Sequence, residues 1–209
     1  MNTSTAIDPS ALHRIGYGLY VLTVNDGKKD NGLIVNTVTQ VASKPLCISV
    51  AVSKSNYSAE VIRETEIMNV NCLTTEAPFS VFERFGFQSG RDTDKFAGLP
   101  EQKRSANGLI VLSEHVNAVL SLRVKETIDL DSHLLFLCEV TESAVLSKGE
   151  SMTYAYYHAN VKPKKPAAPA ATGYVCKICG WVYEGATLPD DLICPICKHG
   201  KEDFVPLST

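Results

Sequence analysis

The sequence predicts a mainly β fold with a few short helices, a closed or half-open barrel, followed by a small four-cysteine metal module. Three observations lead to this prediction. Strand-like runs outnumber helical ones and do not alternate with them regularly, which argues against a doubly wound sheet. Four of the seven cysteines fall in the last 34 residues as two CxxC pairs. A stretch rich in proline and alanine separates the two regions.

The elements of the larger region are predicted in order from its turn residues and apolar runs. Asp8 and Pro9 begin a short helix that ends before Gly16. Strands are predicted at residues 19–24, 33–38, 46–52, 67–73, 120–130 and 133–146, and further helices at residues 57–65 and 79–87. The turn SGRDTDKFAG at residues 89–98 carries charges of the kind that usually stay solvated: Arg91, Asp92, Asp94 and Lys95.

Composition sets the broad class of protein. A chain of 209 residues with 44% hydrophobic content can build one full domain and a small module. No run of 18 apolar residues and no charged-then-apolar leader occurs, so we expect a cytoplasmic protein. Cys47, Cys72 and Cys138 lie singly in strand-like runs, as expected for thiols in a reducing compartment. Residues 1–160 carry 14 basic and 18 acidic side chains, which argues against nucleic-acid binding.

The cysteine quartet is the most specific motif in the chain. Its members are Cys176, Cys179, Cys194 and Cys197. Each CxxC pair lets two sulfurs converge from one tight turn, and the 14 residues between the pairs allow the second turn to face the first. Tetrahedral sulfur ligation admits zinc or iron, so the spacing alone leaves both metals open.

The residues around the quartet narrow this choice. The segment reads CKICGWVY and then LPDDLICPIC, with aromatic residues Tyr174, Trp181, Tyr183 and Phe204. Residues 173–206 resemble rubredoxin. The resemblance implies one iron held by the four cysteines and one-electron transfer. A zinc ribbon is the alternative, because its spacing overlaps this one.

Prolines recur every third residue in the region between the two parts. Pro163, Pro166 and Pro169 stand among alanines and lysines, which favours an extended spacer. A dozen such residues reach roughly 35–40 Å at about 3.1 Å per residue. We therefore divide the chain into a domain at residues 1–160, a linker at 161–173 and a metal module at 174–209.

Three segments of the larger domain carry a second resemblance. NGLIVNTVTQVASKPLCISVAV, SKSNYSAEVIRET and SGRDTDKFAG occur in this order. Together with the leading strand they resemble the flavin reductase-like family of FMN-binding split barrels, over roughly residues 8–160. The resemblance implies a split β-barrel that binds FMN, accepts electrons from NADH or NADPH, and forms a homodimer.

Nine residues are the candidates for binding the flavin. Asn36, Thr37, Val38 and Thr39 resemble the family segment that lies along the flavin ring, and Ser53, Lys54, Ser55 and Asn56 stand where a strand leads into a helix, a suitable place for a phosphate. His158 resembles a family position beside the flavin or the nicotinamide. The same residues also suit a helix cap, ordinary strand hydroxyls and a structural histidine. No catalytic residue is predicted.

The two resemblances on one chain predict an electron-transfer oxidoreductase. Electrons would pass from NAD(P)H to FMN, then to the four-cysteine iron and to an external acceptor. A fusion of this kind implies a flavodiiron protein that reduces oxygen or nitric oxide as that acceptor. One alternative is a flavin reductase that supplies free reduced flavin to a monooxygenase. Another is a non-enzymatic flavin-binding protein with a zinc ribbon.

Overall fold

The computed structural model describes residues 8–163, 173–178, 180–196 and 199–207. The chain separates into two compact units, Met1–Lys162 and Pro163–Thr209, which we describe in turn. Most of the predicted linker, residues 164–172, lies outside the described residues. Within the described ranges, no helix has the length and apolar character needed to cross a membrane.

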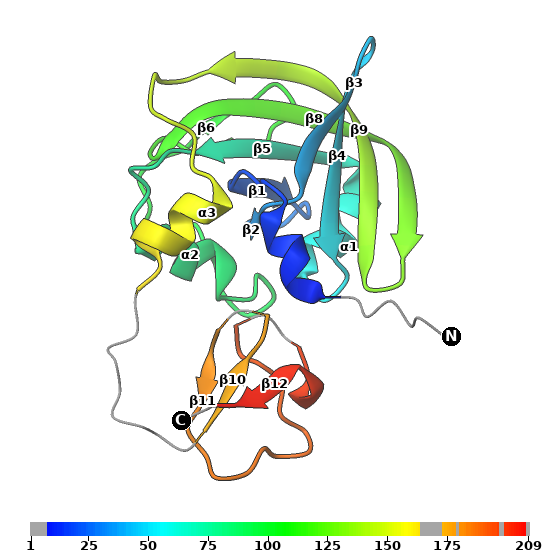
Figure 1. Cartoon of the computed structure of the whole chain (residues 1–209). Coiled ribbons are helices and arrows are strands. Elements are labelled where there is room, and N and C mark those ends of the chain that lie inside the picture. Colours follow the sequence, from blue (N-terminus) through cyan, green and yellow to red (C-terminus); the bar gives the residue numbers. More distant parts are fainter. Residues whose placement is uncertain (1–7, 164–172, 179, 197–198, 208–209) are drawn as a thin grey trace. The chain divides into compact units, whose positions relative to one another are not determined.

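An antiparallel sheet of seven strands forms the larger unit (Figure 1). Its strands are β1 (Tyr20–Asn25), β2 (Asp30–Val35), β3 (Val38–Ser43), β4 (Leu46–Ser53), β5 (Ile67–Leu73), β8 (Val116–Leu130) and β9 (His133–Val145). They lie in the order β2-β1-β5-β8-β9-β4-β3. A separate two-stranded ladder pairs β6 (Lys103–Arg104) with β7 (Ile110–Val111). The prediction of a mainly β fold is confirmed.

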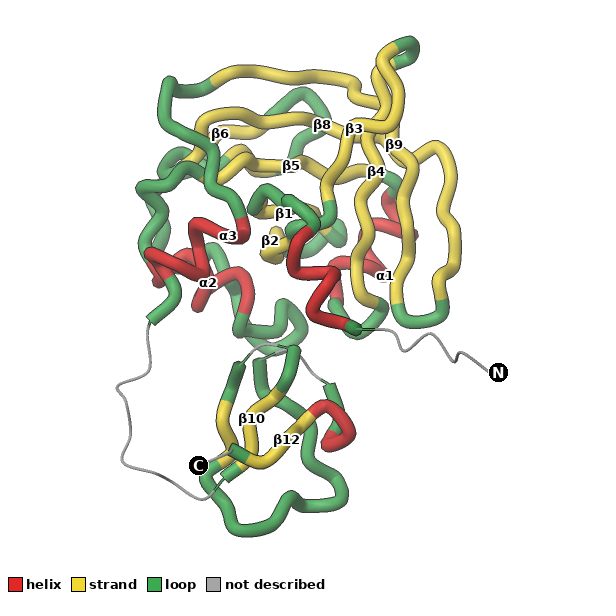
Figure 2. Tube along the Cα trace, in the orientation of Figure 1, coloured by secondary structure: helices red, strands yellow, loops and turns green. Residues whose placement is uncertain are grey.

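The two edges of this sheet are consecutive in the chain. Strands β2 and β3 stand at opposite ends of the strand order, yet only Asn36 and Thr37 separate them. So short a connection brings the edges close together, and the sheet curls into a split barrel (Figure 2). The sequence predicted one strand over residues 33–38, and the structure divides it at this connection. The pattern of apolar residues is the same for one continuous strand as for two strands that follow each other on opposite edges of a sheet.

Helices cover the barrel at several places. They are the 3₁₀ helix Pro9–Arg14, α1 (Tyr57–Thr65), α2 (Phe79–Gly86), α3 (Tyr154–Tyr156) and the π-helix Tyr157–Val161 that continues α3. α1 ends where Glu66 takes a left-handed conformation with φ 58° and its N–H donates to Ile62 O. α2 packs Phe82 against the ring of Tyr157, with centroids 4.3 Å apart. α3 and its π-helical continuation were not predicted.

Apolar residues of β1 are buried on both faces of the strand. Leu22 belongs to the cluster inside the barrel, with Val50 and Phe136. Its neighbour Val21 points the other way and belongs to a second cluster, which includes Phe82 of α2. A strand covered on both faces reads as a nearly continuous apolar run, which explains the sequence LYVLTV.

The charged turn after α2 departs from the sequence expectation in one residue. Lys95 is buried, with 4% of its surface exposed. Its Nζ donates to Gly32 O of β2 (2.8 Å) and to Phe85 O of α2 (3.2 Å). Two backbone carbonyls thus replace water around the ammonium group, and the lysine ties the turn to the edge of the barrel.

A three-stranded sheet forms the smaller unit. Its strands are β10 (Tyr174–Cys176), β11 (Val182–Tyr183) and β12 (Phe204–Pro206), in the order β11-β10-β12, and a 3₁₀ turn at Lys201–Asp203 precedes β12. Cys176, Cys194 and Phe204 form its buried centre. The half-buried Trp181 packs edge-on against Phe204, with centroids 5.9 Å apart. The predicted aromatic set therefore builds a miniature core around two of the cysteines.

Candidate functional site

The first CxxC motif lies in a tight turn after β10. The N–H of Gly180 donates to Cys176 O (2.8 Å), and the N–H of Cys176 donates to Trp181 O (2.8 Å). Gly180 has φ 75°, a conformation that favours glycine and lets the turn close directly after the motif. These two hydrogen bonds use both the N–H and the carbonyl of Cys176 and close the turn.

The second CxxC motif begins in a similar loop. The N–H of Cys194 donates to His199 O (2.8 Å), and Ile193 forms an isolated bridge with Gly200. Cys176 and Cys194 have 0% exposure and belong to the same cluster, so the two loops face each other across one small core. This arrangement fits a metal held between two cysteine pairs. Cys179 and Cys197 lie outside the described residues, and the complete tetrad stays a prediction.

The predicted flavin segments meet at one corner of the barrel. The β3–β4 ladder pairs Val38 with Val50, and beyond it the N–H of Ala51 donates to Thr37 O (3.3 Å). This register brings the β2–β3 connection next to the end of β4, where residues 53–56 lead into α1. Eight of the nine predicted flavin residues therefore lie at this corner: Asn36, Thr37, Val38, Thr39, Ser53, Lys54, Ser55 and Asn56.

The start of α1 offers donors to an anion. Asn56 occupies the N-cap position in an extended conformation, and its side chain makes no capping bond. The first-turn N–H groups of α1 are therefore left without a side-chain cap, at the positive end of the helix dipole. The Oγ atoms of Ser53 and Ser55 lie 2.9 Å apart, and both residues belong to the segment that leads from β4 into α1. The corner therefore fits the phosphate of a bound flavin.

The segment predicted to lie along the flavin ring, residues 36–39, also holds the barrel together. The Thr37 hydroxyl donates to Ala51 O (2.6 Å), so it holds the β2–β3 connection against β4. Asn36 and Val38 are half-buried, whereas Thr39 is exposed on the edge strand β3. The hydrogen bond of Thr37 thus gives this residue a structural role. Contact of Asn36, Val38 and Thr39 with a flavin ring stays a prediction.

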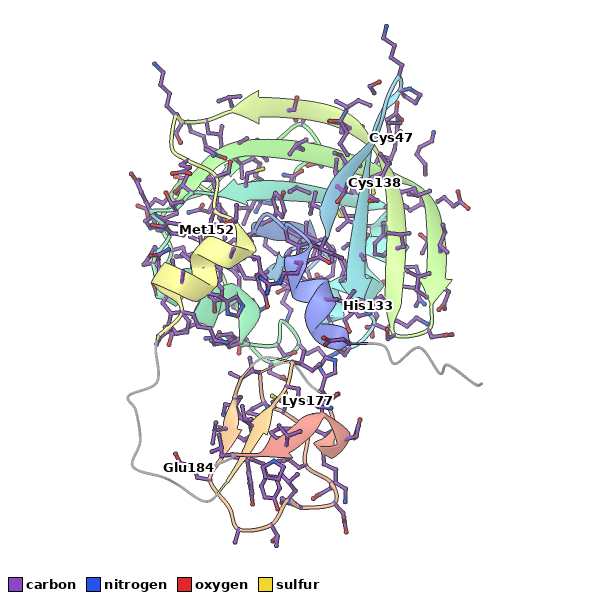
Figure 3. The ribbon with its side chains drawn as sticks, viewed as in Figure 1. Cys47, His133, Cys138, Met152, Lys177 and Glu184 are labelled. Atoms are coloured by element: carbon purple, nitrogen blue, oxygen red, sulfur yellow. The ribbon has the colours of Figure 1, made fainter. Side chains whose placement is uncertain are left out.

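The turn between β8 and β9 adds residues that the sequence did not point to. Lys54 Nζ forms an ion pair with Asp129 Oδ1 at 2.5 Å, and the N–H of Lys54 donates to Ser132 O (3.0 Å). The hydrogen bond from Lys54 lowers the pKa of the Asp129 carboxyl. His133 is paired directly with Ser53 across β4 and β9 (Figure 3). Only the strand register reveals these neighbours, because about 80 residues separate them in the chain.

His158 lies with a different set of elements. It is exposed on the π-helix, with its ring edge-on to those of Tyr154 at 4.5 Å and Tyr157 at 5.3 Å. Tyr157 in turn belongs to the cluster under α2. The structure thus groups His158 with α2 and α3 rather than with the corner at β3 and α1, and its place beside the flavin or the nicotinamide stays a prediction.

A cavity of about 470 Å³ opens elsewhere on the larger unit, between α2, the loop that follows it and residues 112–115. Its lining includes the carboxylates of Glu83, Asp94 and Glu114. Three negative charges oppose a phosphate, and the only guanidinium in the lining, Arg84, already donates to the carbonyls of Lys95 and Ala97. The cavity therefore suits a phosphate less well than the corner at α1 does.

A charged network braces the start of α1. The Tyr57 hydroxyl donates to Asp26 Oδ2 (2.5 Å), and the Arg91 guanidinium lies 5.0 Å above the tyrosine ring. Arg91 also pairs with Glu60 at 2.5 Å. The hydrogen bond from Tyr57, aided by the backbone N–H groups of Lys29 and Lys28, lowers the pKa of Asp26 to about 2. These contacts join the SGRDTDKFAG turn to the helix that begins the phosphate corner.

Replacing Tyr57 by phenylalanine tests this brace. The ring stays, but Asp26 loses the donor that contributes most to its lowered pKa, so we expect a loss of about 0.5–1 kcal/mol at pH 7, allowing for solvent screening. A lowered carboxyl pKa stabilises the fold above the unfolded pKa, and this stabilisation is lost as pH falls through about 2. Urea unfolding at pH 7 and at pH 2 should therefore show a difference that shrinks in acid. Tyr156→Phe, on an exposed ring, is the control, and an equal loss in both variants would contradict the assignment.

The split barrel and the two facing cysteine loops together define the class of the protein, an electron-transfer oxidoreductase. Residues 12–165 match the flavin reductase like domain, and residues 174–205 match the rubredoxin-like domain of rubrerythrin. The chain belongs to the flavin reductase-like family and has the two-domain composition of the high-molecular-weight rubredoxins. It is 37% identical to the high molecular weight rubredoxin of Moorella thermoacetica, over 95% of this chain and 99% of that one.

Other relatives match a smaller share of the chain. The ferric-chelate reductase (NAD(P)H) of Archaeoglobus fulgidus is 35% identical, over 77% of this chain and 94% of its own. A diflavin flavoprotein of Synechocystis is 26% identical over 72% of this chain, but only 26% of that longer protein is covered. Among solved structures, the FMN-binding protein of Thermus thermophilus has a TM-score of 0.60 at 18% identity and covers 69% of this chain and 79% of that one. This likeness confirms the split-barrel fold.

Proposed function

We propose that this chain passes electrons from NAD(P)H through FMN to an iron held by Cys176, Cys179, Cys194 and Cys197, and from there to an external protein. The observation that carries the proposal is the pair of buried cysteines, Cys176 and Cys194, that face each other from two turns on the same chain as a flavin reductase-like barrel. Bound FMN would accept a hydride and release electrons singly, and a four-cysteine iron would carry one electron at a time.

The residues of the barrel corner have separate tasks in this proposal. The first turn of α1, with Ser53, Ser55 and Asn56, would hold the flavin phosphate by its N–H and hydroxyl groups. Lys54 adds the positive charge. Thr37 keeps the β2–β3 connection in place through its bond to β4, so that the adjoining residues can lie along the ring.

The cysteine loops position the sulfurs and exclude water from them. Full burial of Cys176 and Cys194 among aromatic side chains lowers the dielectric around the metal site. Backbone hydrogen bonds close each loop. Loops held in this way suit a centre that changes charge with little rearrangement.

The donor, the acceptor and the assembly belong to the same proposal. The similarity to an NAD(P)H-dependent ferric-chelate reductase supports a reduced nicotinamide as the donor. The similarity to a diflavin flavoprotein supports a flavodiiron protein that reduces oxygen or nitric oxide as the acceptor. We further propose a cytoplasmic homodimer formed through the flavin domain.

Anaerobic rapid mixing of the purified protein with NADH and with NADPH tests the route. We expect the absorbance of the flavin to fall before that of the ferric site, because the chain reduces iron only through the flavin. Removal of FMN should then slow iron reduction by at least roughly a hundredfold, the loss expected when an obligatory carrier is absent. Iron reduction at the same rate without FMN would contradict the proposal.

A truncated chain distinguishes the alternatives. Residues 1–162 form a compact unit of their own and contain every predicted flavin residue. We expect this piece to reduce flavin but to reduce cytochrome c, a one-electron acceptor, at least roughly tenfold more slowly than the full chain. If it instead releases reduced flavin as fast as the full chain delivers electrons, the flavin-supply function would replace the proposed one. A colourless full-length protein that contains zinc would leave only the flavin-binding function.

A further inference from the structure

The cation at the phosphate corner already has an anionic partner. Lys54 Nζ lies 2.5 Å from Asp129 Oδ1, and the two side chains are 37% and 65% exposed. Asp129 also accepts a hydrogen bond from the N–H of Asp131 (2.9 Å), which holds its carboxylate at the end of β8, beside the β8–β9 turn. The carboxylate therefore takes up one of the three donors of the Lys54 ammonium group.

The turn next to Asp129 is attached to the corner at two further points. The N–H of Lys54 donates to Ser132 O (3.0 Å), and Ser53 pairs with His133 at the end of the β4–β9 ladder. The backbone and the side chain of Lys54 both contact the β8–β9 hairpin. The register of β4 against β9 therefore places Lys54 and Asp129 side by side. Lys54 can thus meet an incoming phosphate only with Asp129 close by.

We propose that Asp129 is a built-in counter-anion of Lys54 that weakens the hold of the chain on phosphate-bearing flavins. This inference rests on the proposed binding of the flavin phosphate at the start of α1. An incoming phosphate must share Lys54 with a carboxylate and also meets the negative charge of Asp129 itself. An unopposed lysine would retain the flavin more firmly.

Neutralising Asp129 is the direct test. Asp129→Asn keeps the oxygen that accepts from the N–H of Asp131 but removes the charge. We expect its dissociation constant for FMN, measured by fluorescence quenching at low ionic strength, to fall roughly fivefold, since one charge pair near a protein surface contributes about that much. The affinity for riboflavin, which lacks the phosphate, should not change. The gain for FMN should shrink in about 0.5 M salt.

Three further measurements complete the test. Asp131→Asn removes a charge from the same turn at a residue that tolerates its left-handed conformation as asparagine, and it should leave FMN affinity unchanged. Lys54→Met should weaken FMN binding. When Asp129→Asn is added to Lys54→Met, the FMN affinity should rise by less than fivefold, because the partner of Asp129 is already absent. Inorganic phosphate should compete with FMN more strongly in Asp129→Asn than in the wild type.

The outcomes separate this inference from the function on which it rests. Equal gains in Asp129→Asn and Asp131→Asn, or an equal gain for riboflavin, would overturn the role of Asp129. An unchanged FMN affinity in Asp129→Asn would also overturn it, while the proposed function would stand if the flavin still binds. Failure of every variant and of the wild type to bind FMN would instead overturn the proposed flavin function.

Discussion

Replacing Cys194 by serine is expected to abolish electron transfer to the metal site while flavin reduction continues. Cys194 is fully buried, and its sulfur lies in the same cluster as Cys176. A serine oxygen is a poor ligand for a soft metal and cannot keep the charge of a thiolate, so the site should lose its ferric absorbance at least tenfold. The barrel is a separate compact unit, so its rate of flavin reduction by NAD(P)H should change by less than about twofold.

The measurement follows flavin and iron in the same sample. Metal content, the visible spectrum and cytochrome c reduction are compared between wild type and variant after anaerobic mixing with NADH. Cys47→Ser is the matched control, because Cys47 lies in β4 of the barrel and is half-buried. A Cys194→Ser protein that keeps its iron, or that loses flavin reduction to the same extent as electron delivery, would contradict the division of labour between the two units.

The sequence predicted the elements well where a local signal defines them. The helix predicted at residues 57–65 became α1, and the run at 67–73 became β5, both with the predicted bounds. The two CxxC turns were also predicted from spacing alone, and the structure describes Cys176 and Cys194 of the four cysteines. In each of these cases the residues that determine the structure are neighbours in the chain.

The corner of the barrel shows where such reasoning stops. Both predicted flavin segments were read from the sequence, but their meeting follows from the register of the β3–β4 hairpin, which brings Thr37 beside Ala51. The partners of this corner from the β8–β9 turn, Asp129 and His133, lie some 80 residues away. They become neighbours only through the register of β4 against β9, and no local pattern encodes that register.

Lys95 shows the same limit for burial. In the sequence it is one of four charges in a turn rich in small and polar residues, which is typical of a solvated loop. Its burial follows from two carbonyls that face the turn: Gly32 O, on the edge strand β2, and Phe85 O, near the end of α2. A free edge of a sheet and the end of a helix both leave acceptors without partners, and Lys95 satisfies one of each.

The buried Lys95 should give the barrel an unusual dependence on alkaline pH. Burial lowers the pKa of its ammonium group to about 8, while in the unfolded chain the value stays near 10.5. Between these values the unfolded chain binds more protons, so the stability contributed by Lys95 rises with pH. The neutral amine retains two N–H groups, enough for the carbonyls of Gly32 and Phe85.

Replacing Lys95 by methionine should remove this dependence. We expect the stability advantage of the wild type over Lys95→Met to grow by about 2 kcal/mol from pH 7.5 to pH 9.5, because the folded lysine sheds its costly charge while the methionine never carried one. Urea unfolding followed by circular dichroism suits this measurement, since the single tryptophan, Trp181, reports on the smaller unit. Lys103→Met, at an exposed lysine of β6, should show no such trend. A constant difference between wild type and Lys95→Met across this range would mean that Lys95 reaches water in the folded protein. The turn that it ties to β2 and α2 would then not be held by a buried cation.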